Sequence, residues 1–500
     1  MMINYFLIFP TQLFKDIKIL TKYKCLLIED PVYFTKYPFH KSKLLFHRAS
    51  MKAYYDFLKD KDIDVKYIDY NKPYMDIFKT GDTITYYDPE DFDLTSKLAR
   101  TSARILVLDN PNFLLDSRGI QAYLSEIART QKLKNGQVPR HFLHDASFYR
   151  WIRRYLNILM DGSKPAFDKW TFDSENRKPF PKNTKEPIKD KIYKNKYYDE
   201  AADYVNMHFG ANFGAVNPIY PVTFADTCAV VKSFIKNKLA LFGPYEDAIG
   251  QDINVGYHSG LSAMLNVGLI MPRDLIKEVL KVYDVADLKQ KRTLITSVEG
   301  FIRQVIGWRE YMRLLYRIHG REIKTMNYFG NTGKLSREWF NATTANVYKN
   351  KMPIIYDMIK KTHDRAYLHH IERLMVMGNF ALYNEINPRE IYDWYMICFI
   401  DAYDWVMMAN VYGMSQYALE GMSMTQRPYL CGSSYLLKMS DYKKGPWCEY
   451  WDALFYNFVN KHRAKLNKYR TYLFVKMYDR KTSEQKNKLK RGYVDITNYK

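Results

Sequence analysis

Two hydrophobic patterns divide this sequence. The first, in which strand-like runs alternate with helical segments, covers residues 1–130. A helical pattern is predicted over His40–Lys59, and a shorter helix around Leu13–Thr21. Strands that alternate with helices predict a parallel α/β domain, which binds ligands at the carboxyl ends of its strands. No G-x-G-x-x-G is present, so dinucleotide binding has no motif support here. Five short apolar runs are expected as buried strands: residues 3–9, 25–28, 65–70, 83–88 and 104–110.

The second pattern is helical and covers residues 226–500, where strand-like alternation is scarce. Residues 131–225 join the two parts as a connector. This connector begins with a predicted helix over Phe148–Met160 and continues as a proline- and lysine-rich stretch. Trp170 and Phe172 are expected to pack part of that stretch onto a domain.

Composition and charge restrict the class of protein. Hydrophobic residues make up 47% of the chain and charged residues 26%, which excludes wholesale disorder. The net charge of +22 favours a polyanionic partner, most simply nucleic acid, although a lysine-rich coding bias would produce the same excess.

Five cysteines without a C-x-x-C pair argue against a disulfide framework and a standard zinc site. No apolar run is long enough to cross a membrane, and the N-terminus lacks the basic region of a signal peptide. An intracellular, soluble protein is expected.

Polar residues interrupt an apolar helical run between His369 and Gly413. Buried polar groups need partners, and a bound ligand or the protein itself could supply them. Both alternatives stay open from this stretch alone. The interrupting residues are His369, His370, Arg373, Asn379, Asp401, Asp404 and Asn410, with the aromatic pair Trp394 and Tyr395 between them.

Two earlier segments carry further candidates. The run His258, Ser259, Gly260, Leu261 and Ser262 offers hydroxyls and amides near a helix start, which suit a pyrophosphate or an ordinary N-cap.

Arg309 stands beside Trp308, two positions before Tyr311, and could face a phosphate or an internal carboxylate. Gln304, one helical turn before Trp308, could face the same pocket.

Several longer motifs resemble the photolyase/cryptochrome superfamily over nearly the whole chain. YHSGLSAMLNVGLI (257–270) resembles its flavin-phosphate segment, and SVEGFIRQVIGWREYMR (297–313) its flavin-domain signature. HHIERLMVMGNFAL (369–382) is similar to the paired-histidine helix of (6-4) photolyases. Residues 29–58 and 161–181 look like the bacterial branch that carries iron–sulfur clusters.

The resemblance implies a Rossmann-like α/β antenna domain, a large all-α domain that binds FAD, and repair of UV-damaged DNA. It makes His370 the general acid and His369 its supporting neighbour, and it places Asn410 near the flavin N5 atom. Asp401 and Asp404 would lie near the isoalloxazine and ribityl groups, with Arg373 paired to one of them.

The resemblance also assigns supporting roles outside the flavin pocket. Trp394 and Tyr395 would form an inner electron relay. Tyr429 is the candidate for stacking on a flipped, damaged nucleotide. A lumazine-type antenna chromophore at Gln12, Glu29, His40 and Lys41 and an antenna domain without one are both open.

The chain departs from the bacterial branch at the expected cluster ligands. Ile354, Lys443 and Pro446 stand where cysteines are expected, and Cys448 alone matches. One thiolate cannot hold a cluster that needs about four, so no iron–sulfur cluster or other metal is predicted. Asn346, or a close neighbour, stands where the outer tryptophan of the relay is expected.

The resemblance therefore implies a monomeric, light-driven photolyase of the (6-4) type, with FAD as cofactor and UV-damaged DNA as partner. The alternatives are a cryptochrome-like photoreceptor without repair activity and a DNA-binding structural protein with a vestigial flavin pocket.

Overall fold

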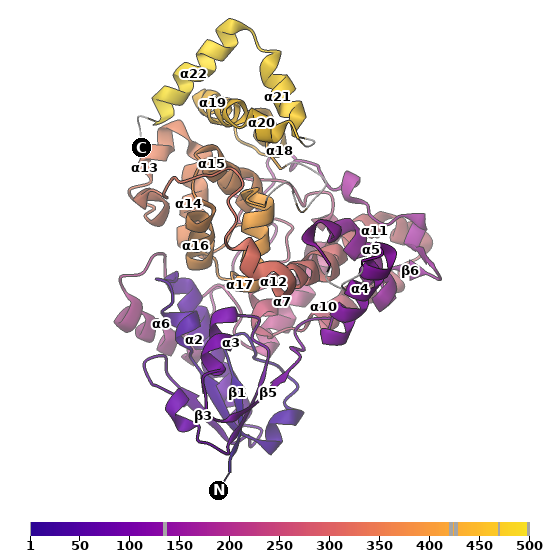
Figure 1. Cartoon of the computed structure of the whole chain (residues 1–500), viewed down its shortest axis with the longest axis vertical. Coiled ribbons are helices and arrows are strands. Elements are labelled where there is room, and N and C mark those ends of the chain that lie inside the picture. Colours follow the sequence, from indigo (N-terminus) through magenta and orange to yellow (C-terminus); the bar gives the residue numbers. More distant parts are fainter. Residues whose placement is uncertain (1, 134–137, 420–423, 425–428, 469–470, 498–500) are drawn as a thin grey trace.

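The computed structural model describes residues 2–133, 138–419, 424, 429–468 and 471–497 (Figure 1). Its N-terminal part is built on a five-stranded parallel sheet in the order β3-β2-β1-β4-β5. This confirms the predicted Rossmann-like α/β arrangement, since the strand order reverses at β1 as in doubly wound folds. The strands are β1 (Asn4–Ile8), β2 (Lys24–Ile28), β3 (Val65–Ile68), β4 (Thr83–Tyr87) and β5 (Arg104–Leu108).

The expected helix around Leu13–Thr21 is wrong for most of its length. The structure has only a short 3₁₀ helix, η1 (Lys18–Lys22). The Leu13 amide donates to the Val267 carbonyl at 2.9 Å, and the Tyr54 hydroxyl donates to the Phe14 carbonyl. These tertiary hydrogen bonds take backbone groups that a helix would need.

The remaining residues up to 225 contain helices and one small hairpin. In the connector, Phe172 is buried, and its amide donates to Glu299. Boundaries at residues 130 and 225 stay predictions. The elements are α1 (Pro31–Phe34), α2 (Lys41–Lys59), η2 (Met75–Ile77), α3 (Phe92–Leu98), α4 (Ser117–Thr130), η3 (Arg140–Phe142), α5 (Asp145–Leu156), β6 (Met160–Asp161), β7 (Lys164–Pro165), η4 (Ala166–Asp168), η5 (Asp173–Glu175) and α6 (Lys196–Phe209).

The rest of the described chain is helical, as predicted, and most of it lies above the sheet in Figure 1. Within the described residues, no helix combines the length and the apolar character needed to cross a bilayer. The helices are α7 (Phe224–Asn237), α8 (Leu239–Phe242), α9 (Ser262–Val267), α10 (Pro272–Asp284), α11 (Leu288–Ile302), α12 (Arg309–Ile323), η7 (Arg337–Phe340), α13 (Asn346–Lys351), α14 (Pro353–Arg365), α15 (Asn379–Tyr383), α16 (Pro388–Cys398), α17 (Asp404–Met408), α18 (Ser433–Met439), α19 (Pro446–Lys461), α20 (Arg463–Leu466), α21 (Tyr472–Asp479) and α22 (Ser483–Thr497).

Three π-helical segments interrupt this helical part: η6 (Arg303–Trp308), η8 (Glu372–Gly378) and η9 (Ala409–Ser415). Segments η8 and η9 pack so closely that a Cβ atom on Gly378 would clash with the Ser415 hydroxyl. Because π-helical turns are rare and are frequently found at functional sites, these three segments point to the region of a site.

Polar side chains on one face of α2 join the two parts of the molecule. His40, the N-cap, lies 3.0 Å from the His363 carbonyl, and His47 lies 2.9 Å from the Tyr403 hydroxyl. Between them, the Lys43 Nζ atom donates to the carbonyls of Met396 at 3.1 Å and Ala402 at 2.6 Å. This face therefore fixes the segment that leads to Asp401.

Candidate functional site

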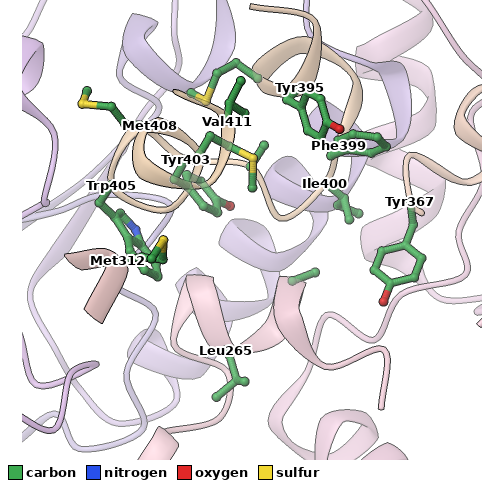
Figure 2. Packing of buried hydrophobic residues seen from close by; sticks show 14 of the residues in the cluster. Leu265, Met312, Tyr367, Tyr395, Phe399, Ile400, Tyr403, Trp405, Met408 and Val411 are labelled. Carbon is green, nitrogen blue, oxygen red and sulfur yellow. The ribbon is translucent and has the colours of Figure 1, made fainter. Parts of the chain in front are cut away.

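A cavity of about 700 Å³ lies inside the helical part, and all three π-helical segments contribute to its wall. Much of the wall is apolar and comes from helices distant in sequence. Figure 2 labels six of its lining residues: Leu265, Met312, Tyr367, Tyr395, Trp405 and Val411. A cavity of this size and character is suited to an organic ligand.

Thirteen of the candidate residues line this cavity, although they come from segments more than 170 positions apart. Tertiary folding therefore brings most of the expected cofactor and lesion residues to one surface. They are His258, Ser259, Leu261, Ser262, Gln304, Trp308, Arg309, His370, Arg373, Tyr395, Asp401, Asn410 and Tyr429.

An ion pair between Arg373 and Asp401 anchors one wall. Arg373 donates to both carboxylate oxygens of Asp401, at 2.9 and 3.2 Å. The Ser262 hydroxyl donates to the same carboxylate at 2.6 Å. Ser262 therefore serves this anchor in addition to any ligand contact.

The Asn410 amide, also in the cavity lining, is oriented by its neighbours. Its Oδ1 atom accepts from Trp308 Nε1 at 3.0 Å, and its Nδ2 atom donates to the Val406 carbonyl at 2.7 Å. An amide has two donor hydrogens and two acceptor lone pairs, so one of each remains for a ligand.

Arg309 points toward the N-terminal part of the molecule. Its Nη1 atom donates to the Asn112 carbonyl at 2.8 Å, and its guanidinium lies 4.3 Å from the centre of the Phe113 ring. Burial lowers the pKa of Arg309 to about 10. Its Nε and Nη2 atoms are buried and have no hydrogen-bond partner among the described residues.

Three residues expected at the cofactor lie behind the cavity wall instead. The Tyr311 hydroxyl donates to the Leu143 carbonyl, and Asn379 donates to the Cys431 sulfur atom. Asp404 accepts hydrogen bonds from Tyr316 and Tyr392. None of the three is in the lining, because their side chains are used in packing between helices.

The paired histidines occupy different environments. His369 is buried, whereas the His370 side chain is 43% exposed and lines the cavity. Burial in the wall, together with the cations Arg303 and Arg373, lowers the pKa of His370 to about 4. His370 Nε2 lies 3.9 Å from Asp247 Oδ1.

Sequence reasoning missed the acidic pair Glu246–Asp247 in this wall. Burial raises the pKa of Glu246 to about 7 and that of Asp247 to about 6. Gln304 donates to Glu246 at 2.6 Å, so its amide is bound to this acid. Two adjacent acids before the Gly250 turn were the available sequence signal.

The expected inner relay continues to a tryptophan that was also missed. The ring centres of Tyr395 and Trp394 are 5.4 Å apart, and those of Trp394 and Trp339 are 5.1 Å apart. Trp394 lies behind the cavity wall and donates through Nε1 to the Trp339 carbonyl. Trp339 lies seven positions before Asn346, so spacing alone did not reveal it.

The residues considered for an antenna make internal contacts. Glu29 is buried and accepts hydrogen bonds from Arg48, Tyr67, Tyr204 and the Tyr70 amide.

The other three antenna candidates are tied to the protein in the same way. Gln12 donates to the Tyr87 carbonyl, His40 accepts from the Ser42 amide, and the Lys41 amide donates to the Phe213 carbonyl. These contacts explain the side chains of Gln12, Glu29 and His40 structurally, whereas Lys41 contributes only its backbone amide, and the antenna stays a prediction.

The chain is 34% identical to a (6-4) photolyase from Agrobacterium fabrum over 365 residues, covering 70% of this chain and 69% of that protein. Residues 6–220 match the model of the family described as deoxyribodipyrimidine photo-lyase-related protein. The chain belongs to this photolyase-related family.

Two solved structures share the fold of this photolyase-related chain. A bacterial class III photolyase from Agrobacterium tumefaciens matches with a TM-score of 0.53 and 14% identity, over 100% of this chain and 98% of that one. A cryptochrome from Synechocystis matches with a TM-score of 0.51 and 11% identity, over 98% and 94% of the two chains. The fold is therefore that of photolyases and cryptochromes.

Proposed function

We propose that this chain is an FAD-dependent photolyase that repairs (6-4) pyrimidine photoproducts in UV-damaged DNA. Family membership supports the general class. The specific proposal rests on one observation: His370 shares a cavity wall with the Arg373–Asp401 pair and faces the same space as Asn410.

The cavity residues fit the cofactor that photolyases typically contain. The free amide groups of Asn410 suit the flavin ring, while the Ser259 hydroxyl suits phosphate or ribose oxygens. When bound in its reduced form, FAD absorbs blue or near-ultraviolet light and supplies an electron to the lesion.

The chain's own residues have two tasks at the lesion. Aromatic side chains that line the cavity can stack on a base turned out of the duplex. These are Tyr429, Tyr435, Tyr456 and Phe474. His370 holds a proton at Nε2 for the oxygen group that moves during (6-4) repair. Asp247, 3.9 Å from that atom, can exchange the proton with it after a small side-chain rotation.

A cryptochrome-like photoreceptor without repair activity is the second candidate. The pKa of His370, near 4, leaves its ring neutral at neutral pH in the absence of DNA. A neutral imidazole donates a proton weakly, so repair requires that the phosphates of a bound lesion raise this pKa.

The test is repair of defined oligonucleotides by the flavin-loaded protein under blue light. We expect repair of (6-4) photoproducts and little repair of cyclobutane dimers. His370→Asn should lower the rate about a hundredfold or more, with unchanged flavin content. His208→Asn, at an exposed position on α6, is the matched control. Failure of the wild type to repair either lesion would favour the photoreceptor.

A further inference from the structure

Three imidazole rings converge at the edge of the cavity. His258 precedes α9, and His369 and His370 precede η8. One ring nitrogen from each lies within 4.8 Å of the other two, the only such group of potential metal ligands among the described residues.

Two of these rings have a buried nitrogen atom that finds no hydrogen-bond partner in the described part of the chain, Nε2 of His258 and Nδ1 of His369. A buried polar atom left unpaired is destabilising, so a pair of them in one place calls for an explanation. A shared ligand that accepts both lone pairs would provide one.

Both rings also contact groups outside the cluster. The His258 ring is hydrogen-bonded to a backbone group of Glu246. His369 Nε2 faces the Glu372 carboxylate at 3.6 Å, and that carboxylate is fixed by Lys361 at 2.9 Å. Histidines that ligate metals have this arrangement, in which a carboxylate or carbonyl takes one N–H and exposes the opposite lone pair.

The His258 and His369 rings are stacked with planes 17° apart and centres separated by 4.7 Å. A metal ion must lie near each ring plane, so binding requires a turn of these rings. His370 is half-exposed and can close over the ion.

We propose that His258, His369 and His370 form a binding site for a divalent transition metal ion. Three imidazoles with an open fourth position suit Zn²⁺ and its Co²⁺ substitute, whereas the hard cations Mg²⁺ and Ca²⁺ require oxygen ligands. The ion occupies the nitrogen lone pair of His370 that would otherwise take a proton. Resting on the proposed function, this makes the metal a reversible inhibitor of repair.

The test uses full-length protein without a polyhistidine tag. Zn²⁺ binding is measured by calorimetry, and the site is reported by the visible absorption of bound Co²⁺, at wavelengths beyond the flavin bands. We expect about one ion per chain, and an affinity at least about tenfold lower in His258→Gln, His369→Gln and His370→Asn. The control His208→Gln should bind as the wild type does.

The variants His258→Gln and His369→Gln could misfold, so circular dichroism is used to check their folding. If they are misfolded, the test rests on Zn²⁺ binding by His370→Asn, whose position is half-exposed. Equal binding by wild type and His370→Asn, or no binding by the wild type, would overturn the inference.

The consequence for activity is tested separately. Zn²⁺ should suppress repair and a chelator should restore it. If the site binds Zn²⁺ but no lesion is repaired with or without the chelator, the proposed function fails while the metal site stands. If repair proceeds and Zn²⁺ does not bind, the metal site fails alone.

Discussion

The guanidinium of Arg373 and the carboxylate of Asp401 form a two-pronged ion pair across the cavity wall, with Nη1–Oδ1 at 2.9 Å and Nη2–Oδ2 at 3.2 Å. Both side chains are about nine-tenths buried. Removing one member of such a buried pair destabilises the folded protein, because the remaining buried charge is left uncompensated.

Arg373→Met should therefore lower the free energy of unfolding by about 3–5 kcal/mol and weaken flavin retention. Urea denaturation and flavin absorbance after gel filtration measure the two effects. Arg389→Met, which breaks the exposed pair with Asp393, is the control and should cost less than about 1 kcal/mol. Equal losses in both variants would show that burial of the Arg373 pair is unimportant.

Lys43 should make stability depend on pH, because burial lowers its pKa from 10.5 to about 7. Between these values the unfolded chain binds a proton that the folded chain does not. The free energy of unfolding of the wild type should therefore rise with pH relative to that of Lys43→Met, by up to about 1.4 kcal/mol per pH unit.

Denaturation at several pH values from 7 to 10 measures this difference. The exposed Lys277→Met should show no such trend. A difference between Lys43→Met and the wild type that does not change with pH would contradict the expectation.

Trp339 should act as the next step of the electron relay beyond Trp394, since their ring centres are 5.1 Å apart. Trp339→Phe should slow light-driven reduction of the bound flavin several-fold, measured by absorbance under blue light with an external reductant. Trp447→Phe, in the buried start of α19, is the control. Unchanged kinetics in Trp339→Phe would exclude this route.

The five cysteines should divide sharply in their reactivity. Cys228 is exposed, whereas the other four are buried, and burial raises the pKa of Cys25 and Cys431 to about 12. A thiol reagent should modify one cysteine in the native protein and five after denaturation, because the thiolate is the reactive form. Mass spectrometry should locate the native adduct on Cys228, and Cys228→Ser should abolish it.

DNA affinity should fall steeply with salt, since the net charge of +22 favours contacts with phosphates. If about six phosphates are contacted, affinity should drop roughly a thousandfold between about 50 and 200 mM salt. Damaged and undamaged duplexes should give the same slope, with a constant offset in favour of the lesion. A flat salt profile would argue against DNA as the partner.

The sequence by itself determined the two-part architecture and pointed to thirteen of the residues that line the cavity. Local hydrophobic periodicity decides whether a segment becomes a strand or a helix. The motifs around Ser259, Trp308 and His370 are contiguous in the sequence, so they can be recognised without the fold. The helix expected around Leu13–Thr21 failed because Val267 and Tyr54 take its backbone groups, and no local pattern records such partners.

Tertiary structure alone decided which side chains face the cavity and what their neighbours do to them. Asp401 and Asp404 are three positions apart, yet one pairs with Arg373 in the lining and the other is bound by tyrosines behind the wall. The low pKa of His370 and the raised pKa of Asp247 arise from burial and from charges on distant segments. Burial and through-space electrostatics depend on distances that only the folded chain defines.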